Sequence, residues 1–255
     1  MDHAAKVAET FLAPCGSELP ADDMRVIQRD GWYQTITPST KSTQGNEVTF
    51  SRVAQKDAER VARATIDDYT ALGLPFKWSV GPLTEPADFG DVLERLGFRY
   101  WQGRGMAIEP ARWSSVPPPG VTVERVTQAT FEDYYTAFVR GWATEAVEAP
   151  SWRTSMRRAL ERRHRYYLAR VDGEPAGSGG FAIKPRSAYL VGGNVFERFR
   201  GRGVYRALID ARVRDLAELG IPLATTIARD ATSAPILERF GFETLFRSRV
   251  YKYEP

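Results

Sequence analysis

Residues 195–208 read V-F-E-R-F-R-G-R-G-V-Y-R-A-L, and this stretch decides the fold. Gly201 and Gly203 allow the backbone to turn sharply and to present bare N–H groups. These groups lie between a predicted strand over 187–196 and a predicted amphipathic helix over 204–219, at the positive end of the helix dipole. Cations are unfavourable there unless an anion is bound, yet the segment holds Arg198, Arg200, Arg202 and Arg206. The sequence therefore predicts a site for a multiply charged anion, such as a diphosphate.

Other phosphate-binding loops fit this stretch less well. A Walker loop needs a Gly-Lys pair, and the chain contains none. A Rossmann fingerprint needs a third glycine, where this chain has Arg206. The plainest alternative is a solvated basic loop whose glycines serve only the turn. The preceding strand, the arginines and the following helix together favour the anion site over that alternative.

Hydrophobic periodicity predicts a mixed α/β fold for residues 121–255. Strands are predicted at 121–126, 166–171, 175–183, 187–196, 223–228 and 245–253. Helices are predicted at 129–142, 151–163, 204–219 and 233–240. Asp172-Gly173 is a typical two-residue hairpin turn between the second and third of these strands. The predicted order, β-α-α-β-β-β-α-β-α-β, indicates a mixed sheet.

Residues 200–204 read R-G-R-G-V and resemble the acyl-CoA-binding loop of the GNAT acetyltransferase superfamily, whose pattern is (R/Q)-x-x-G-x-(G/A). Tyr205 departs from the sixth position of that pattern, so its ring must point away from the phosphates. Residues 230–242 resemble the closing element of the family, with Asp230 in place of the usual Asn. The resemblance implies the tandem GNAT (acyl-CoA N-acyltransferase) fold, an α/β mixed sheet built from two repeats.

The same resemblance implies acetyl-CoA as co-substrate and no metal. Amides from Arg202 to Arg206 would hold the diphosphate, and the backbone of Val195 and Phe196 would pair with the pantetheine arm like an extra strand. The implied cofactor-binding residues are Val195, Phe196, Arg200, Gly201, Arg202, Gly203, Val204, Tyr205, Arg206, Asp230 and Ser233.

Acetyl transfer to an amine needs a base for the ammonium proton and a donor for the departing thiolate. The family often uses a Tyr four residues before the closing Gly as the donor, and Leu237 stands there in this chain. The strand over 187–196 also lacks Glu and Asp. Two interpretations stay open for an enzyme: water relays the protons, or another side chain substitutes. The candidates are Tyr189, Tyr205, Glu174 and Glu238, of which Tyr189, Glu238 and Tyr205 are the predicted catalytic residues. The alternative to an enzyme is a non-catalytic acyl-CoA-binding or sensing pseudo-acetyltransferase.

The acceptor of an N-acetyltransferase would be an amine on a small molecule or peptide, bound at the two early helices. The predicted acceptor-binding residues are Tyr134, Phe138, Trp142 and Glu145. Core packing is the alternative for the aromatic residues, and a solvated acidic loop is the alternative for Glu145. A basic stretch over 157–165 is interpreted as an exposed helix face, because no nucleic-acid recognition motif accompanies it.

The chain divides at a proline-rich linker over 114–120, which reads S-S-V-P-P-P-G. L-E-R-L-G-F at 93–98 matches L-E-R-F-G-F at 237–242, and L-G-L-P at 72–75 matches L-G-I-P at 219–222. The near-constant spacing indicates a duplication. Residues 1–113 are therefore interpreted as a degenerate GNAT-like copy without the CoA loop, and residues 121–255 as the acetyl-CoA-binding copy.

Composition and charge narrow the classes of protein to which the chain can belong. The formal charge is 35 − 32 = +3, which is too small to indicate nucleic acid by itself. One cysteine and two histidines argue against an intrachain disulfide and a Cys/His metal site. Neither a membrane-spanning run nor a signal pattern occurs, so we expect a cytoplasmic protein that does not act in the membrane, as a monomer or homodimer.

Overall fold

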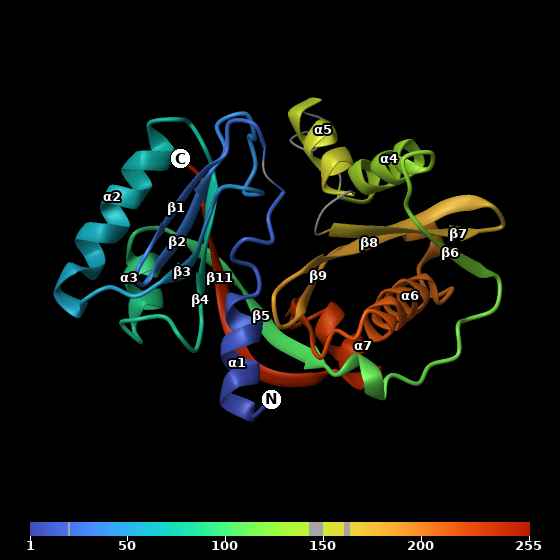
Figure 1. The fold of residues 1–255 in the computed structure, drawn as a ribbon. Helices are drawn as coiled ribbons and strands as arrows, with labels where there is room; N and C mark the ends of the chain where they lie inside the picture. The colour runs from blue at the N-terminus through green and yellow to red at the C-terminus, as the bar shows by residue number, and fades with distance from the viewer. Residues whose placement is uncertain (20, 143–149, 161–163) are drawn as a thin grey trace. The chain divides into compact units, whose positions relative to one another are not determined.

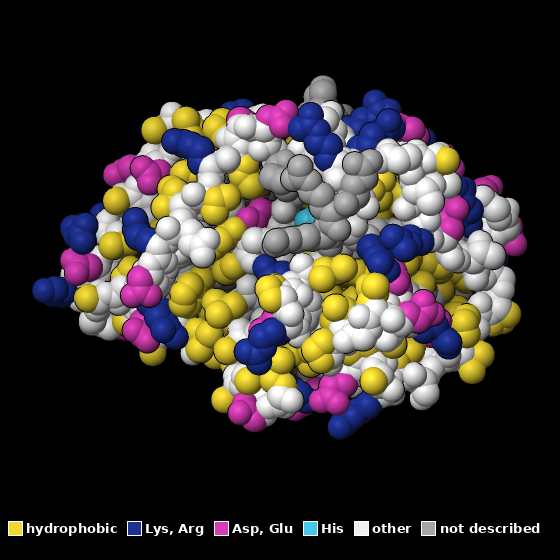
Figure 2. All heavy atoms as spheres, in the orientation of Figure 1, with side chains coloured by type: hydrophobic (Ala, Val, Ile, Leu, Met, Phe, Trp, Pro, Cys, Tyr) yellow, Lys and Arg dark blue, Asp and Glu magenta, His cyan; other side chains and the backbone are white. Residues whose placement is uncertain are grey.

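The computed structural model describes residues 1–19, 21–142, 150–160 and 164–255, and these form two compact units (Figure 1). The first unit joins residues 1–107 to 227–255, and the second consists of residues 108–226. No helix in the described part of the chain is long and apolar enough to cross a membrane. Dark-blue basic and magenta acidic side chains are interspersed over the face shown in Figure 2.

The second unit contains the predicted loop and the strands around it. Its sheet runs β6 (Val121–Arg125), β7 (His164–Val171), β8 (Glu174–Ile183) and β9 (Ala188–Val195), with each neighbour antiparallel. The start of β10 (Ala224–Arg229) then lies parallel to β9. Asp172 and Gly173 have φ angles of 52° and 79°, which confirms the predicted hairpin turn. Helices α4 (Phe131–Trp142), α5 (Pro150–Ala159) and α6 (Val204–Glu218) complete the predicted order.

Helices α4 and α6 cover opposite faces of this sheet (Figure 1). A Cβ on Gly179 would lie 3.1 Å from the guanidinium of Arg212 in α6. A Cβ on the next residue, Gly180, would meet the ring of Tyr166, which stacks on Tyr134 in α4. Successive strand residues point to opposite faces, so the two glycines define an α6 face and an α4 face of β8.

The first unit contains the strand order β1 (Arg25–Arg29), β2 (Trp32–Ile36), β3 (Glu47–Ser51), β4 (Phe76–Val80), β11 (Glu243–Tyr253) and β5 (Arg99–Ile108). Its helices are α1 (His3–Leu12), α2 (Ala58–Thr70), α3 (Phe89–Arg95) and α7 (Ser233–Arg239). Aromatic rings dominate its core: Trp32 lies edge-on to Trp78 at 5.4 Å, and Tyr69 stacks on Phe76 at 4.1 Å. The burial of such rings is the main stabilising contribution in this unit.

The matched sequence segments end their helices in the same backbone geometry. Gly97 after α3 and Gly241 after α7 both have φ 91°, while Gly73 after α2 and Gly220 after α6 have φ 60° and 68°. In each case the residue after the glycine donates its N–H to the carbonyl five residues earlier, at 3.0–3.1 Å: Phe98 to Leu93, Leu74 to Tyr69, Ile221 to Leu216 and Phe242 to Leu237. The matched segments therefore end their helices in the same way, and because glycine commonly ends helices so, the duplication stays a prediction.

Strand β11 explains why the compact units differ from the sequence repeats. It is the last strand of the second repeat, yet it is hydrogen-bonded between β4 and β5 of the first, antiparallel to both. The units are accordingly divided at 107/108 and at 226/227, rather than at the linker over 114–120. The predicted domain boundary over 114–120 stays a prediction about the two sequence repeats, because the compact units have other boundaries.

Candidate functional site

The predicted anion loop joins β9 to α6 in the second unit. A single 3-10 turn, η4 (Glu197–Phe199), follows β9, and Gly201 and Gly203 then take φ angles of 79° and 81°. The first bond of the α-helix runs from the N–H of Ala207 to the carbonyl of Gly203 at 3.0 Å. The N–H groups of the preceding helical residues, 204–206, therefore have no acceptor within the helix. The N–H of Arg202, which also belongs to the predicted set of amides, instead donates to the carbonyl of Phe199 at 3.4 Å.

Three of the four arginines of the loop segment are paired with carboxylates, while Arg206 donates to the hydroxyl of Ser115 at 3.3 Å. Arg198 forms an ion pair with Glu174 at 2.7 Å. Arg202 pairs with Asp172 at 3.1 Å, and Arg200 pairs with Glu197 at 3.9 Å. All six side chains are largely exposed, so each pair contributes little to stability. An incoming diphosphate would therefore compete for these guanidinium groups with weakly held partners.

The surroundings of the loop determine which of its residues can be substituted without a steric clash. A Cβ on Gly203 would lie 2.7 Å from Pro118 of the proline-rich segment, whereas a Cβ on Gly201 would meet nothing within 4 Å. The ring of Tyr205 lies against β9, because a Cβ on Gly193 would be 3.3 Å from its Cε2. The ring thus turns toward the sheet, in agreement with the prediction that it points away from a bound phosphate.

One edge of β9 is open beyond its first residues. Within the described residues, β9 pairs with β10 only at Ala188 and Tyr189. The N–H of Phe196 donates to Ala176 of β8 at 2.9 Å, and its carbonyl accepts from Phe199 at 2.9 Å. Peptide groups alternate in direction along a strand, so the backbone of Val195 points away from β8, toward the open edge. Val195 can thus pair with an extended ligand as predicted, while both backbone groups of Phe196 are already bonded.

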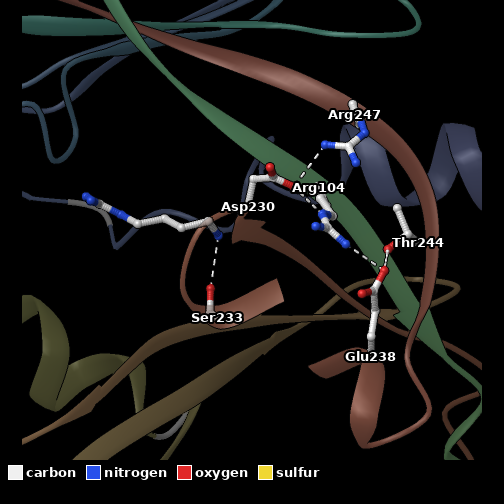
Figure 3. A network of polar contacts seen from close by, with 7 residues as sticks. Arg104, Asp230, Ser233, Glu238, Thr244 and Arg247 are labelled. Carbon is white, nitrogen blue, oxygen red and sulfur yellow. Dashed lines mark hydrogen bonds and ion pairs between the residues drawn. The ribbon is translucent and has the colours of Figure 1, made fainter. Parts of the chain in front are cut away.

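Asp230, Ser233 and Glu238 lie in the first unit, in a polar network of their own (Figure 3). Arg104 of β5 forms ion pairs with Asp230 and, at 2.6 Å, with Glu238. The hydroxyl of Ser233 accepts the N–H of Arg229 at 2.9 Å and so caps the turn before α7. Sequence reasoning missed Arg104 because it is 126 residues away from Asp230 and belongs to no motif.

The network lowers the pKa of both carboxyl groups. The guanidinium of Arg104, followed by that of Arg247, holds the pKa of Asp230 below its ordinary value. The hydroxyl of Thr244 and the guanidinium of Arg104 do the same to the pKa of Glu238. Carboxylates stabilised in this way are weak bases, which makes Glu238 poorly suited to accept a proton from an ammonium.

Replacing Arg104 by Met should give a pH-dependent loss of stability. A carboxyl group whose pKa is lower in the folded state than in the unfolded state stabilises the fold at pH values above its unfolded-state pKa of about 4. That contribution is lost as the pH falls through the folded-state pKa. Wild type should therefore have the higher urea midpoint at pH 7, and the two midpoints should converge below about pH 4. A gap that stays constant across this range would show that the carboxylates are not responsible.

The predicted acceptor-binding residues differ in how far their side chains are exposed. Tyr134 is 1% exposed and stacks on Tyr166, and Phe138 is 7% exposed, so both are core residues in this structure. Trp142 at the end of α4 is 37% exposed and is accessible to a ligand. Glu145 lies outside the described residues. In the basic stretch, Arg157 forms an exposed ion pair with Glu132 of α4, as an ordinary surface residue does. The prediction of an exposed helix face is wrong for the end of the stretch, because His164 is buried and begins strand β7.

The remaining catalytic positions lie on β9 and α7. Tyr189 is half-buried on β9 and pairs with Ala182 of β8, two residues along from Gly180. Because side chains alternate along a strand, Tyr189 shares the α4 face of the sheet, whereas Tyr205 lies on the α6 face. Leu237 of α7 is 1% exposed, which makes it a core residue. The described residues bring no three His, Cys, Asp or Glu side chains together as a metal site would require.

Comparisons with known proteins relate part of the chain to a sequence family and the whole chain to a fold. Residues 127–242 match the sequence model of the acetyltransferase (GNAT) family. No curated protein matches the chain. Among solved structures, a GCN5-related N-acetyltransferase from Kribbella flavida superposes with a TM-score of 0.68 at 14% identity, over 99% of this chain and 94% of its own.

Two further structures share the whole fold. A conserved protein of unknown function from Staphylococcus epidermidis has a TM-score of 0.66 at 15% identity, over 91% of this chain and 94% of its own. A tandem GNAT protein from the clavulanic acid biosynthesis pathway has a TM-score of 0.59 at 13% identity, over 99% of this chain and 94% of its own. The chain therefore has the tandem GNAT fold, and its residues 127–242 match the acetyltransferase (GNAT) family model.

Proposed function

We propose that this protein is an N-acetyltransferase that moves an acetyl group from acetyl-CoA to an amine of a small molecule or peptide. The observation that carries the proposal is the β9–α6 loop, where two glycines with positive φ precede a helix whose first amides have no acceptor within the helix. A diphosphate satisfies those amides, and the open edge of β9 beside them accepts an extended arm.

Each part of the loop has a role in this proposal. The amides of residues 203–206 bind the diphosphate oxygens, because the N–H of Arg202 already donates to Phe199. The guanidinium of Arg200 adds charge beside them. Gly201 and Gly203 supply the backbone shape. The backbone of Val195 pairs with an amide of the pantetheine arm. The predicted contacts of Asp230 and Ser233 with the pantetheine arm stay predictions, because both side chains already have partners in the first unit.

The chemistry is direct attack. The ammonium first loses a proton to water, and the amine nitrogen then forms a bond to the thioester carbon. The C–S bond breaks, the nitrogen releases its second proton to water, and the CoA thiolate takes up a proton. We assign that donor role to Tyr189, because it shares the sheet face of α4, where the exposed Trp142 is available to an acceptor. Tyr205 is the weaker candidate, because it lies on the other face of the sheet, and burial raises the pKa of its hydroxyl.

Replacing Tyr189 by Phe should lower kcat by about 10²-fold and leave the KM for acetyl-CoA nearly unchanged, since the ring stays and only the proton donor is lost. Tyr205→Phe should have a smaller effect on kcat. Steady-state kinetics of thiol release measures both variants. Equal losses, or a larger loss in Tyr205→Phe, would contradict the assignment of Tyr189.

A second candidate function is acyl-CoA binding without turnover. The buried Leu237 at the position of the usual Tyr favours it, as does the lack of Glu and Asp on β9. Calorimetric titration of acetyl-CoA into the full chain, followed by a screen of amines for CoA release, separates the two. Binding with amine-dependent release supports the enzyme. Binding without release supports the sensor, and no binding defeats both.

We also propose that the first repeat is a degenerate copy that lacks CoA binding. Six residues, 52–57, connect β3 to α2, whereas eight residues, 196–203, connect β9 to α6. The shorter connection contains no glycine, so it cannot form the nest of amides at the helix start. This copy supplies the sheet that holds β11.

A further inference from the structure

Arg212 of α6 is a buried arginine, only 2% exposed. Its Nε donates to the carbonyl of Leu208 at 2.9 Å, and its Nη1 lies 3.2 Å from the carbonyl of Gly180 and 3.5 Å from that of Val191. Its Nη2 is buried and has no hydrogen-bond partner. A buried donor without a partner is costly, so this side chain needs an explanation beyond packing.

No carboxylate among the described residues offsets the charge of Arg212. The groups that interact with it electrostatically are the hydroxyls of Tyr205, Tyr167 and Tyr134. Asp215, one turn further along α6, is bound instead by Arg165 and Tyr167. Burial lowers the pKa of the guanidinium, as expected for a cation removed from water without a counterion.

The guanidinium lies at an irregularity in the sheet. The register between β8 and β9 passes from Ser178↔Asn194 to Gly180↔Val191, so Gly179 alone opposes residues 192–193. This is a β-bulge, and a bulge leaves backbone groups out of the ladder. The glycines permit the close approach, because a Cβ on Gly179 would be 3.1 Å from the Cζ of Arg212, and a Cβ on Gly193 would be 3.6 Å from its unpartnered Nη2.

The same bulge lies along the course of the proposed pantetheine arm. The backbone of Val195 points to the open edge of β9, and two residues back along the strand Gly193 points to the same edge. An arm that leaves the diphosphate at the loop and pairs with Val195 next reaches Gly193. Its thioester would then lie above the buried cation.

We propose that Arg212 is a positioning residue for acetyl transfer, which holds the β9 bulge in shape and places a positive charge beneath Gly193, where the thioester carbonyl lies. The inference rests on the proposed function. As the amine attacks, the carbonyl π pair moves onto oxygen, and the nearby amide and cation stabilise the negative charge until it returns to expel the thiolate. A cation with no carboxylate partner is well suited to this, because nothing else neutralises its field.

The test uses the full chain with acetyl-CoA labelled with ¹³C at the carbonyl. Isotope-edited infrared spectroscopy of the bound thioester reports its polarisation without requiring turnover. Arg212→Met keeps an unbranched apolar chain as far as the position of Nε and removes the charge, and Arg212→Lys keeps a positive charge. Arg214→Met is the matched control, since Arg214 lies on the same helix, is half exposed and pairs with Asp210 at 2.9 Å.

In the wild type and in Arg214→Met, binding should shift the carbonyl stretch to lower frequency than in free acetyl-CoA. Arg212→Met should lose at least half of that shift, and Arg212→Lys should recover part of it. The affinity for CoA, which has no acetyl carbonyl, should not change, while kcat falls on the order of 10²-fold. If Arg212→Met does not fold, Arg212→Gln provides the same comparison.

The outcomes separate the two proposals. Acetyl-CoA that fails to bind the wild type overturns the proposed function and this inference with it. Acetyl-CoA that binds the wild type and Arg212→Met with the same carbonyl frequency overturns the inference alone. A joint fall of kcat and CoA affinity in Arg212→Met also overturns the inference alone, since that is the effect of a purely structural residue.

Discussion

Replacing Gly201 by Asp should weaken CoA binding far more than replacing it by Asn. A side chain at this position enters open space, because a Cβ would meet nothing within 4 Å. The φ angle of 79° strains both variants similarly, since Asn and Asp tolerate the left-handed region better than most residues. The variants therefore differ mainly by one negative charge beside the proposed diphosphate.

The size of the effect follows from Coulomb's law. Two unit charges at about 4 Å repel by about 1–4 kcal/mol between water-like and surface-like dielectric constants, which is about fivefold to several hundredfold in affinity. Titration calorimetry with CoA measures it, and raising the salt concentration should narrow the gap between the variants. Equal losses in both variants would assign the effect to backbone strain. Unchanged affinity in both would mean that the loop is not the diphosphate site.

Gly203 is the less informative position for this experiment, although the sequence motif draws attention to it. A Cβ there would lie 2.7 Å from Pro118, so any side chain must displace the proline-rich segment. Loss of binding in a Gly203 variant would combine a steric clash with an electrostatic one. The open surroundings of Gly201 avoid that ambiguity.

The sequence predicted the elements of the second repeat because their signals are local. Periodicity and the two glycines located the end of β9 and the start of α6 correctly, and the Asp172-Gly173 turn has the expected positive φ angles. The match between 93–98 and 237–242 likewise corresponds to two helix ends with equal geometry. Each of these features depends on residues close together in the chain.

Features that depend on distant partners were not predictable. Periodicity marks β11 as a strand but does not say that β4 and β5 flank it. Arg104 and Arg212 look like ordinary surface arginines in the sequence, and their partners lie on other elements. The paired glycines at 179–180 and 192–193 were the one available signal for Arg212, since adjacent small residues on neighbouring strands allow a large side chain to approach the backbone.

The position of β11 between β4 and β5 leads to a strong prediction about fragments of the chain. Residues 121–255, produced alone, should not give a folded monomer, although they contain the whole predicted CoA-binding repeat. In the full chain β11 pairs with β5 from Glu243 to Lys252 and with β4 from Arg249 to Tyr253. The fragment lacks both partners, so an eleven-residue strand would expose both of its edges, a strong driving force for aggregation.

Co-expression of residues 1–120 with residues 121–255 should restore a soluble complex, because the missing strands are then supplied in trans. Size-exclusion chromatography and thermal unfolding of the fragment, of the co-expressed pair and of the intact chain make the comparison. A fragment 121–255 that is monomeric and unfolds cooperatively at the temperature of the intact chain would contradict the prediction. It would also show that the sequence repeat folds as an independent domain and that β11 finds a place within its own repeat.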